Sequence, residues 1–156
     1  MSAIYDEIKA DHDEAREMMA KLADTTERAV KTRERLFEEF KIDMWAHHKV
    51  EEAVFYAVLK ERRGTKGEAF EAINEHHVAN GLLEELDSFP VDSVEWGTKF
   101  GVLKELIEHH MEEEEEETFV EARDVLSDDE ANEFGNSFRS RKKVVMAALK
   151  PIESAA

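Results

Sequence analysis

The chain has 156 residues, enough for one domain with a sizeable core, and its 38 acidic and 21 basic side chains give a formal charge of −17. This charge opposes binding to nucleic-acid phosphates or to anionic membrane surfaces. The chain has no cysteine, which excludes thiol catalysis, iron–sulfur ligation and disulfides, so any metal must be bound by His and carboxylate. No apolar run could span a membrane and no signal peptide is visible, which predicts a cytoplasmic protein.

Abundant Ala, Glu, Leu and Lys with six glycines and two prolines favour an all-α fold. The first helix is expected at about 3–23, with His12 inside its apolar stripe. Asp24, followed by Glu27 three positions later, predicts the start of a second helix that continues to about Arg62.

The turn at 63–67 leads to a third helix, which carries His76 on an apolar stripe and ends near Pro90. A fourth helix is expected from Asp92 or Ser93 to about 126. The capping-box pattern from Ser127 to Glu130 predicts a fifth helix at about 128–149, ending before Pro151.

A His-x-x-x-Glu motif occurs twice, at His47 with Glu51 and at His110 with Glu114. Residues four apart lie on one face of a helix, so each pair could bind one metal ion, and iron accepts both ligand types. His47 shares its stripe with Phe40, Met44 and Val58 and is favoured over His48, while His110 is favoured over His109 mainly by the repeat.

A longer repeat contains these motifs, because His12 lies 35 residues before His47 and His76 lies 34 residues before His110. Each half is expected to form a helical hairpin, and two hairpins form an up-down-up-down four-helix bundle. Folding the halves together around a pseudo-twofold axis would gather four His and two Glu at one centre for two metal ions. The expected bundle covers 1–126, and 127–156 adds a C-terminal helix that packs on the same domain or extends from it.

Burying these six groups without partners would cost several kcal/mol each, which favours the metal-binding interpretation. The remaining histidines, His48, His77 and His109, are expected to be solvated or to contact a ligand. Within the acidic run 112–117 Glu114 is preferred by spacing, and Glu113, Glu115 and Glu117 are possible substitutes. Tyr56 is expected to serve packing. No Glu precedes any of these histidines by three positions, so the ferritin-like diiron motif is excluded.

The sequence resembles the hemerythrin-like family, also called the HHE cation-binding domain, over about residues 4–126. The resembling segments are 11–13, 47–56, 75–76 with 82–86, and 110–119. The resemblance implies a non-heme diiron centre with two bridging carboxylates, Glu51 and Glu114, and four terminal ligands, His12, His47, His76 and His110. The chain has Ala57 and Val120 where family members commonly have Pro, and Ala72 where oxygen carriers have a fifth His.

From this resemblance we expect a non-heme diiron protein that binds or senses O2, NO or iron. Having four His instead of five fits diiron binding better than reversible oxygen carriage. The alternatives are a diiron oxidase or peroxidase, an iron-cluster repair-type protein, and a metal-free helical interaction protein. No nucleic-acid or membrane partner is expected, and the oligomeric state is left open.

Overall fold

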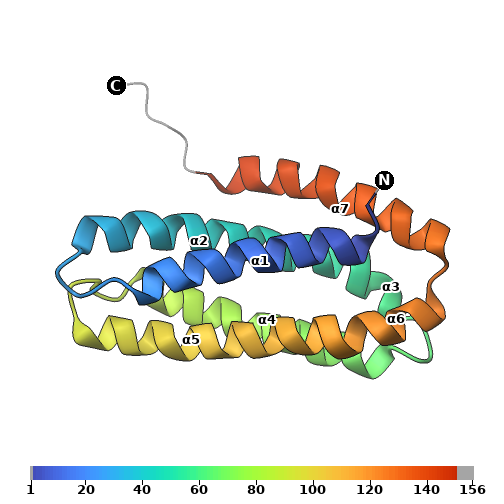
Figure 1. The fold of residues 1–156 in the computed structure, drawn as a ribbon, viewed down its shortest axis with the longest axis horizontal. Helices are drawn as coiled ribbons and strands as arrows, with labels where there is room; N and C mark the ends of the chain where they lie inside the picture. The colour runs from blue at the N-terminus through green and yellow to red at the C-terminus, as the bar shows by residue number, and fades with distance from the viewer. Residues whose placement is uncertain (1, 151–156) are drawn as a thin grey trace.

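The computed structural model describes residues 2–150, and every regular element in this range is helical (Figure 1). Two of the four rods of the bundle are interrupted by a short π-helical turn. The elements are α1 (Ile4–Ala23), α2 (Val30–Glu51), η1 (Glu52–Tyr56), α3 (Ala57–Leu59), α4 (Lys66–Asp87), α5 (Val94–Glu113), η2 (Glu114–Thr118), α6 (Phe119–Val125) and α7 (Asp128–Leu149).

The rods form an up-down-up-down bundle in which short loops join antiparallel neighbours. Helix α1 packs against α2 and α5, and α4 also packs against α2 and α5. Helix α7 lies over α1 and α2, on the side of the bundle away from α4 and α5 (Figure 1). The predicted all-α bundle with an added C-terminal helix is confirmed.

The ends of the helices mostly follow the capping signals. Ser127 and Glu130 form the predicted capping box of α7, and the Ser93 hydroxyl accepts the Trp96 N–H at the start of α5. The predicted start of the second helix at Asp24 is wrong, because Asp24 instead ends α1 and α2 begins at Val30. Pro151 lies outside the described residues.

A π-helical turn lies at the Glu of each His-x-x-x-Glu motif: η1 begins directly after Glu51, and η2 begins at Glu114 itself. A π turn contains one residue more than an α turn, so the buried stripe moves along the sequence by one position. On the second rod, the α-helical spacing of the stripe through His47 predicted that Val58 is buried. The structure instead buries Leu59, one position later, and Val58 is half-buried. The wide turns could not be predicted from α-helical spacing.

The apolar core consists of two clusters that lie on either side of the histidines along the rods. One cluster contains Ile4, Ile8, Phe55, Tyr56 and Phe138, and the other contains Met19, Phe40, Met44, Trp96 and Phe100. This division places a polar layer in the middle of the bundle. No helix within residues 2–150 combines the length and the apolar character that crossing a membrane requires.

Candidate metal centre

The six residues selected by spacing come together in this polar layer, and all are buried. Helix α2 contributes both His47 and Glu51, and η2 begins with Glu114, one helical turn after His110 at the end of α5. Helices α1 and α4 contribute one histidine each, His12 and His76. None of the six is more than 7% exposed.

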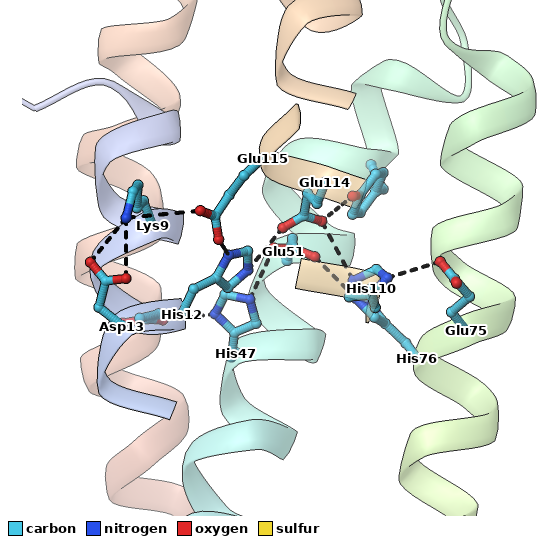
Figure 2. A network of polar contacts seen from close by, with 12 residues as sticks. Lys9, His12, Asp13, His47, Glu51, Glu75, His76, His110, Glu114 and Glu115 are labelled. Atoms are coloured by element: carbon cyan, nitrogen blue, oxygen red, sulfur yellow. Dashed lines mark hydrogen bonds and ion pairs between the residues drawn. The ribbon is translucent and has the colours of Figure 1, made fainter. Parts of the chain in front are cut away.

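Two groups of four ligand atoms share the two glutamates. Within each group the atoms lie within 4.8 Å of one another; one group contains His12 and His47, the other contains His76 and His110, and both contain Glu51 and Glu114. Figure 2 shows the two histidine pairs on opposite sides of the glutamates. The pseudo-twofold arrangement expected from the sequence repeat is thus present in the geometry.

Each glutamate directs one oxygen to each side. Glu51 Oε2 lies 3.0 Å from His47 Nε2, and its Oε1 lies 3.0 Å from His76 Nε2. Glu114 Oε1 lies 3.0 Å from His12 Nε2, and its Oε2 lies 3.6 Å from His110 Nε2. This is the arrangement that a carboxylate bridging two cations requires.

Several of these buried atoms have no hydrogen-bond partner, although they lie close together. They are His12 Nε2, His47 Nε2, both oxygens of Glu51, and Glu114 Oε1. An unsatisfied buried polar atom costs about 1–3 kcal/mol, so five such atoms at one place require cations or protons between them. A cation between the Nε2 atoms and the carboxylates would satisfy all of them, so the residues fit the ions that the spacing predicts.

The opposite nitrogen of every imidazole contacts a carboxylate. His12 Nδ1 lies 2.7 Å from Glu115, His47 Nδ1 2.8 Å from Asp11, His76 Nδ1 2.9 Å from Glu52, and His110 Nδ1 2.9 Å from Glu75. An ionised carboxylate only accepts hydrogen bonds, so each Nδ1 is the donor and each Nε2 is left to face the centre. Such contacts fix the ring and increase its basicity as a metal ligand.

These carboxylates follow the same twofold pattern as the ligands. Asp11 and Glu75 each precede the first histidine of a half and bind the second histidine of that half. Glu52 and Glu115 each follow a shared glutamate and bind the first histidine of the other half. Every half therefore supports histidines on both sides of the centre.

The charges in this layer shift the pKa values of its groups strongly. Burial lowers the pKa of His47, but the charge of Glu51 and the hydrogen bond to Asp11 raise it to about 10. Burial likewise lowers the pKa of His76, while contacts with Glu51 and Glu52 raise it to about 9. Burial raises the pKa of Glu51, but the neighbouring His47 and His76 lower it well below its ordinary value.

The structure gives Tyr56 a polar contact that the sequence did not indicate. Its buried hydroxyl donates to Glu114 Oε2, inside the centre. Burial and the charge of Glu114 raise the pKa of Tyr56 well above its usual value, so the hydroxyl keeps its proton. Tyr56 and Glu114 are far apart in the sequence, so this contact could be found only from the way the two hairpins dock.

The other histidines and the substitute glutamates lie outside the cluster. His77 is exposed and His109 is 72% exposed, whereas His48 is buried, with its ring stacked on His76 at 4.1 Å and its Nδ1 atom 2.8 Å from Asn80. Glu115 contacts His12 Nδ1 and Arg16, and Glu113 and Glu117 lie toward the surface.

A small cavity between α4 and η2 reaches the centre from the surface. Ala72 lies in its wall, where a larger side chain would reduce the space. The cavity is rich in carboxylates and ends at two of the proposed ligands; its lining includes Glu68, Glu71, Glu75, Glu113, Glu117, His110 and Glu114.

A four-helix bundle with a buried His and carboxylate cluster at its middle defines a class of helical proteins suited to binding cations. Comparison with known families agrees with this class. The family model described as the Hemerythrin HHE cation binding domain matches residues 3–122. The chain therefore belongs to the hemerythrin HHE cation-binding family.

Two further comparisons show related chains. A Hemerythrin HHE cation binding domain-containing protein from Mycobacterium kansasii, known from its crystal structure, has the same fold, with a TM-score of 0.84 and 21% identity over 95% of this chain and 90% of that one. A protein of Nostoc sp. described as a DNA nickase is 24% identical over 146 residues, which are 94% of this chain. The matched region is 41% of that relative, so the chain spans about two fifths of its length.

Proposed function

We propose that this protein is a non-heme diiron protein that binds or senses O2, NO or iron. The observation that carries the proposal is the pair of four-residue clusters that share Glu51 and Glu114. His12 and His47 would hold one iron, His76 and His110 would hold the other, and the two glutamates would contact both. Imidazole and carboxylate ligands suit iron, and the chain offers no thiolate that would favour a different metal.

An iron pair in this position would supply reversible electron transfer and coordination sites for a diatomic molecule. The chain's own residues provide the surroundings. The Nδ1 contacts fix all four imidazoles, and Tyr56 fixes the orientation of Glu114. The core clusters on either side exclude water along the bundle, which leaves the cavity beside Ala72 as an approach for a small ligand.

Two observations favour an oxidase or peroxidase as the second candidate. The cavity ends at His110 and Glu114, and the buried Tyr56 hydroxyl donates a hydrogen bond to the same glutamate. Catalytic turnover of peroxide or O2 by the iron-loaded protein would distinguish the enzyme from a binding protein. The five unpartnered buried atoms speak against the metal-free interaction protein, and the charge of −17 speaks against DNA as a partner.

The proposal is tested by measuring iron per chain together with the absorption spectrum before and after reduction and exposure to O2 or NO. We expect two irons per folded chain and a spectrum that changes with each treatment. His76→Ala should lower the iron content, because a buried ligand is lost. His77→Ala is the matched control, since this neighbouring ring is exposed, and it should retain both irons. Less than about a tenth of an iron per folded wild-type chain, after growth with added iron, would exclude the centre.

A further inference from the structure

The four carboxylates that contact the histidine Nδ1 atoms differ in whether a Lys or Arg side chain is paired with them. On the side of His12 and His47, both are paired with cations. Lys142 Nζ of α7 lies 2.5 Å from Asp11 Oδ2, and Arg16 Nη2 lies 2.6 Å from Glu115 Oε2. Lys9 adds a third positive charge 3.8 Å from Glu115. The negative charges behind these two imidazoles are therefore compensated.

On the side of His76 and His110, the corresponding carboxylates have no such partner. Within residues 2–150 no Lys or Arg nitrogen lies within 4.0 Å of Glu52 or Glu75, which pair only with His76 and His110, respectively. Glu75 instead lines the acidic cavity together with Glu71 and Glu113. This side of the centre thus retains its negative charge.

Helix α7 also covers only one side. Phe138 is buried and packs edge-on against the His47 ring, with ring centroids 5.7 Å apart, and Lys142 lies one turn further along the same helix. The cavity opens at the opposite side, where it reaches His110. The two sides of the pseudo-symmetric centre therefore differ in charge and in access. Both differences favour a cation on the side of His76 and His110.

We propose that the two cation positions are unequal and that the position at His76 and His110 fills first and binds more tightly. An uncompensated carboxylate behind an imidazole strengthens it as a donor and adds attraction for a cation, whereas a Lys or Arg on that carboxylate offsets both effects. Lys142 and Arg16 are positioning residues that weaken the second site. This inference rests on the proposed function, because it requires two cations at the centre.

The direct test uses Zn2+ alone as the probe, added at one equivalent per chain to metal-free protein before crystallisation. Anomalous scattering at the zinc edge should show an occupancy between His76 and His110 at least about fivefold higher than that between His12 and His47. Equal occupancies, or a higher one at His12 and His47, overturn this inference alone. Zinc at neither position overturns the proposed function as well.

Variants can separate a charge effect from a structural effect. Removing a supporting carboxylate should weaken binding of the first Zn2+ ion (the first step), and removing a cation should strengthen binding of the second Zn2+ ion (the second step). In Zn2+ titrations against a competing chelator, Glu75→Gln should weaken the first step by about 10- to 100-fold, which is the usual range for a residue that supports a ligand. Lys142→Met should strengthen the second step by roughly tenfold, for one removed charge interaction of about 1.4 kcal/mol. Lys143→Met, which removes an exposed charge on the same helix, should change neither step.

Lys142 also contacts Asp43, so its removal leaves the buried Asp43 and the partly buried Asp11 without a cation and can prevent folding. Arg16→Gln provides the second measurement, since Arg16 is a third exposed and its loss also uncovers a supporting carboxylate. It should strengthen the second step as well. A merely structural role for these cations would weaken both steps. A second step that is unchanged or weaker in the folded variants, as judged by circular dichroism, overturns the proposal.

Discussion

Each imidazole of the centre lies between two carboxylates, and in the metal-free protein protons take the place of cations. The pKa values of about 10 for His47 and about 9 for His76 mean that both rings are protonated at neutral pH. Their charges then compensate Glu51, which is fully buried. Protons would therefore compete with the proposed metal ions for the same Nε2 atoms.

This competition predicts a pH dependence that differs between the two forms. A raised folded-state pKa contributes stability below the ordinary value of 6.5, and this contribution is lost as pH rises through about 9 and 10. The free energy of unfolding of the metal-free protein should therefore fall between pH 6.5 and 9.5. In the metal-loaded protein coordination replaces these protons, so the loss should be absent or much smaller. Urea unfolding of both forms at three pH values measures this free energy. Parallel declines in the two forms would contradict the assignment of His47 and His76 as metal ligands.

The sequence identified the six clustered residues but not most of the contacts around them. Spacing within one helix was sufficient for His47 with Glu51, because both lie on one face of α2. The partner of Glu115 could not be predicted, since His12 lies 103 positions away and the contact depends on how the two hairpins dock. His48 was expected to be solvated or to contact a metal ligand, and the structure shows a buried ring stacked on His76, one of the proposed ligands.

At the scale of elements, α7 is attached to the bundle partly by a close approach of backbones. A Cβ atom at Gly135 would lie 2.1 Å from the Ser2 carbonyl oxygen and 2.8 Å from the Ala3 carbonyl carbon. Both of those atoms belong to the backbone that leads into α1, so neither can move by a side-chain rotation. Only a residue without a side chain allows α7 to pack at this distance.

Gly135→Ala should therefore destabilise the protein by about 1–3 kcal/mol, the usual cost of overpacking a tight contact. Gly101→Ala is the matched control, because Gly101 lies within α5 and a Cβ there would have no neighbour within 4 Å. In the control, the better helix propensity of Ala should stabilise by up to about 1 kcal/mol. Denaturant unfolding of both variants compares the two effects, and equal stabilisation of both would show that α7 does not pack closely at Gly135.

The helices themselves were predicted well where a local signal marks their ends. The capping box at Ser127 placed the start of α7, and the short loops between amphipathic segments gave the bundle topology. The start at Asp24 was wrong because the same residue types also occur in turns, and residues 24–29 lie outside any helix. The π turns that begin after Glu51 and at Glu114 were missed because the apolar pattern of a helix has no separate sign for one extra residue.

For the whole molecule, the two core clusters predict that the fold survives without ions, since each contains its own aromatic and aliphatic contacts. Metal-free protein should keep most of its helical circular dichroism signal but melt at a lower temperature. At a hundredfold excess over the dissociation constant, one bound ion stabilises by about 2.7 kcal/mol, which corresponds to roughly 5 °C or more in Tm. Equal Tm values for metal-free and iron-loaded protein in calorimetry would show that no ion binds at the core.

The acidic wall of the cavity beside His110 has a consequence for the speed of cation uptake. Six glutamates at its lining raise the local concentration of divalent cations, so capture from dilute solution should be faster than unassisted diffusion. Salt would slow this capture, because the Debye length is only about 8 Å at physiological ionic strength. The same negative field repels anionic chelators such as citrate. We therefore expect citrate to remove a cation only slowly once the protein has bound it.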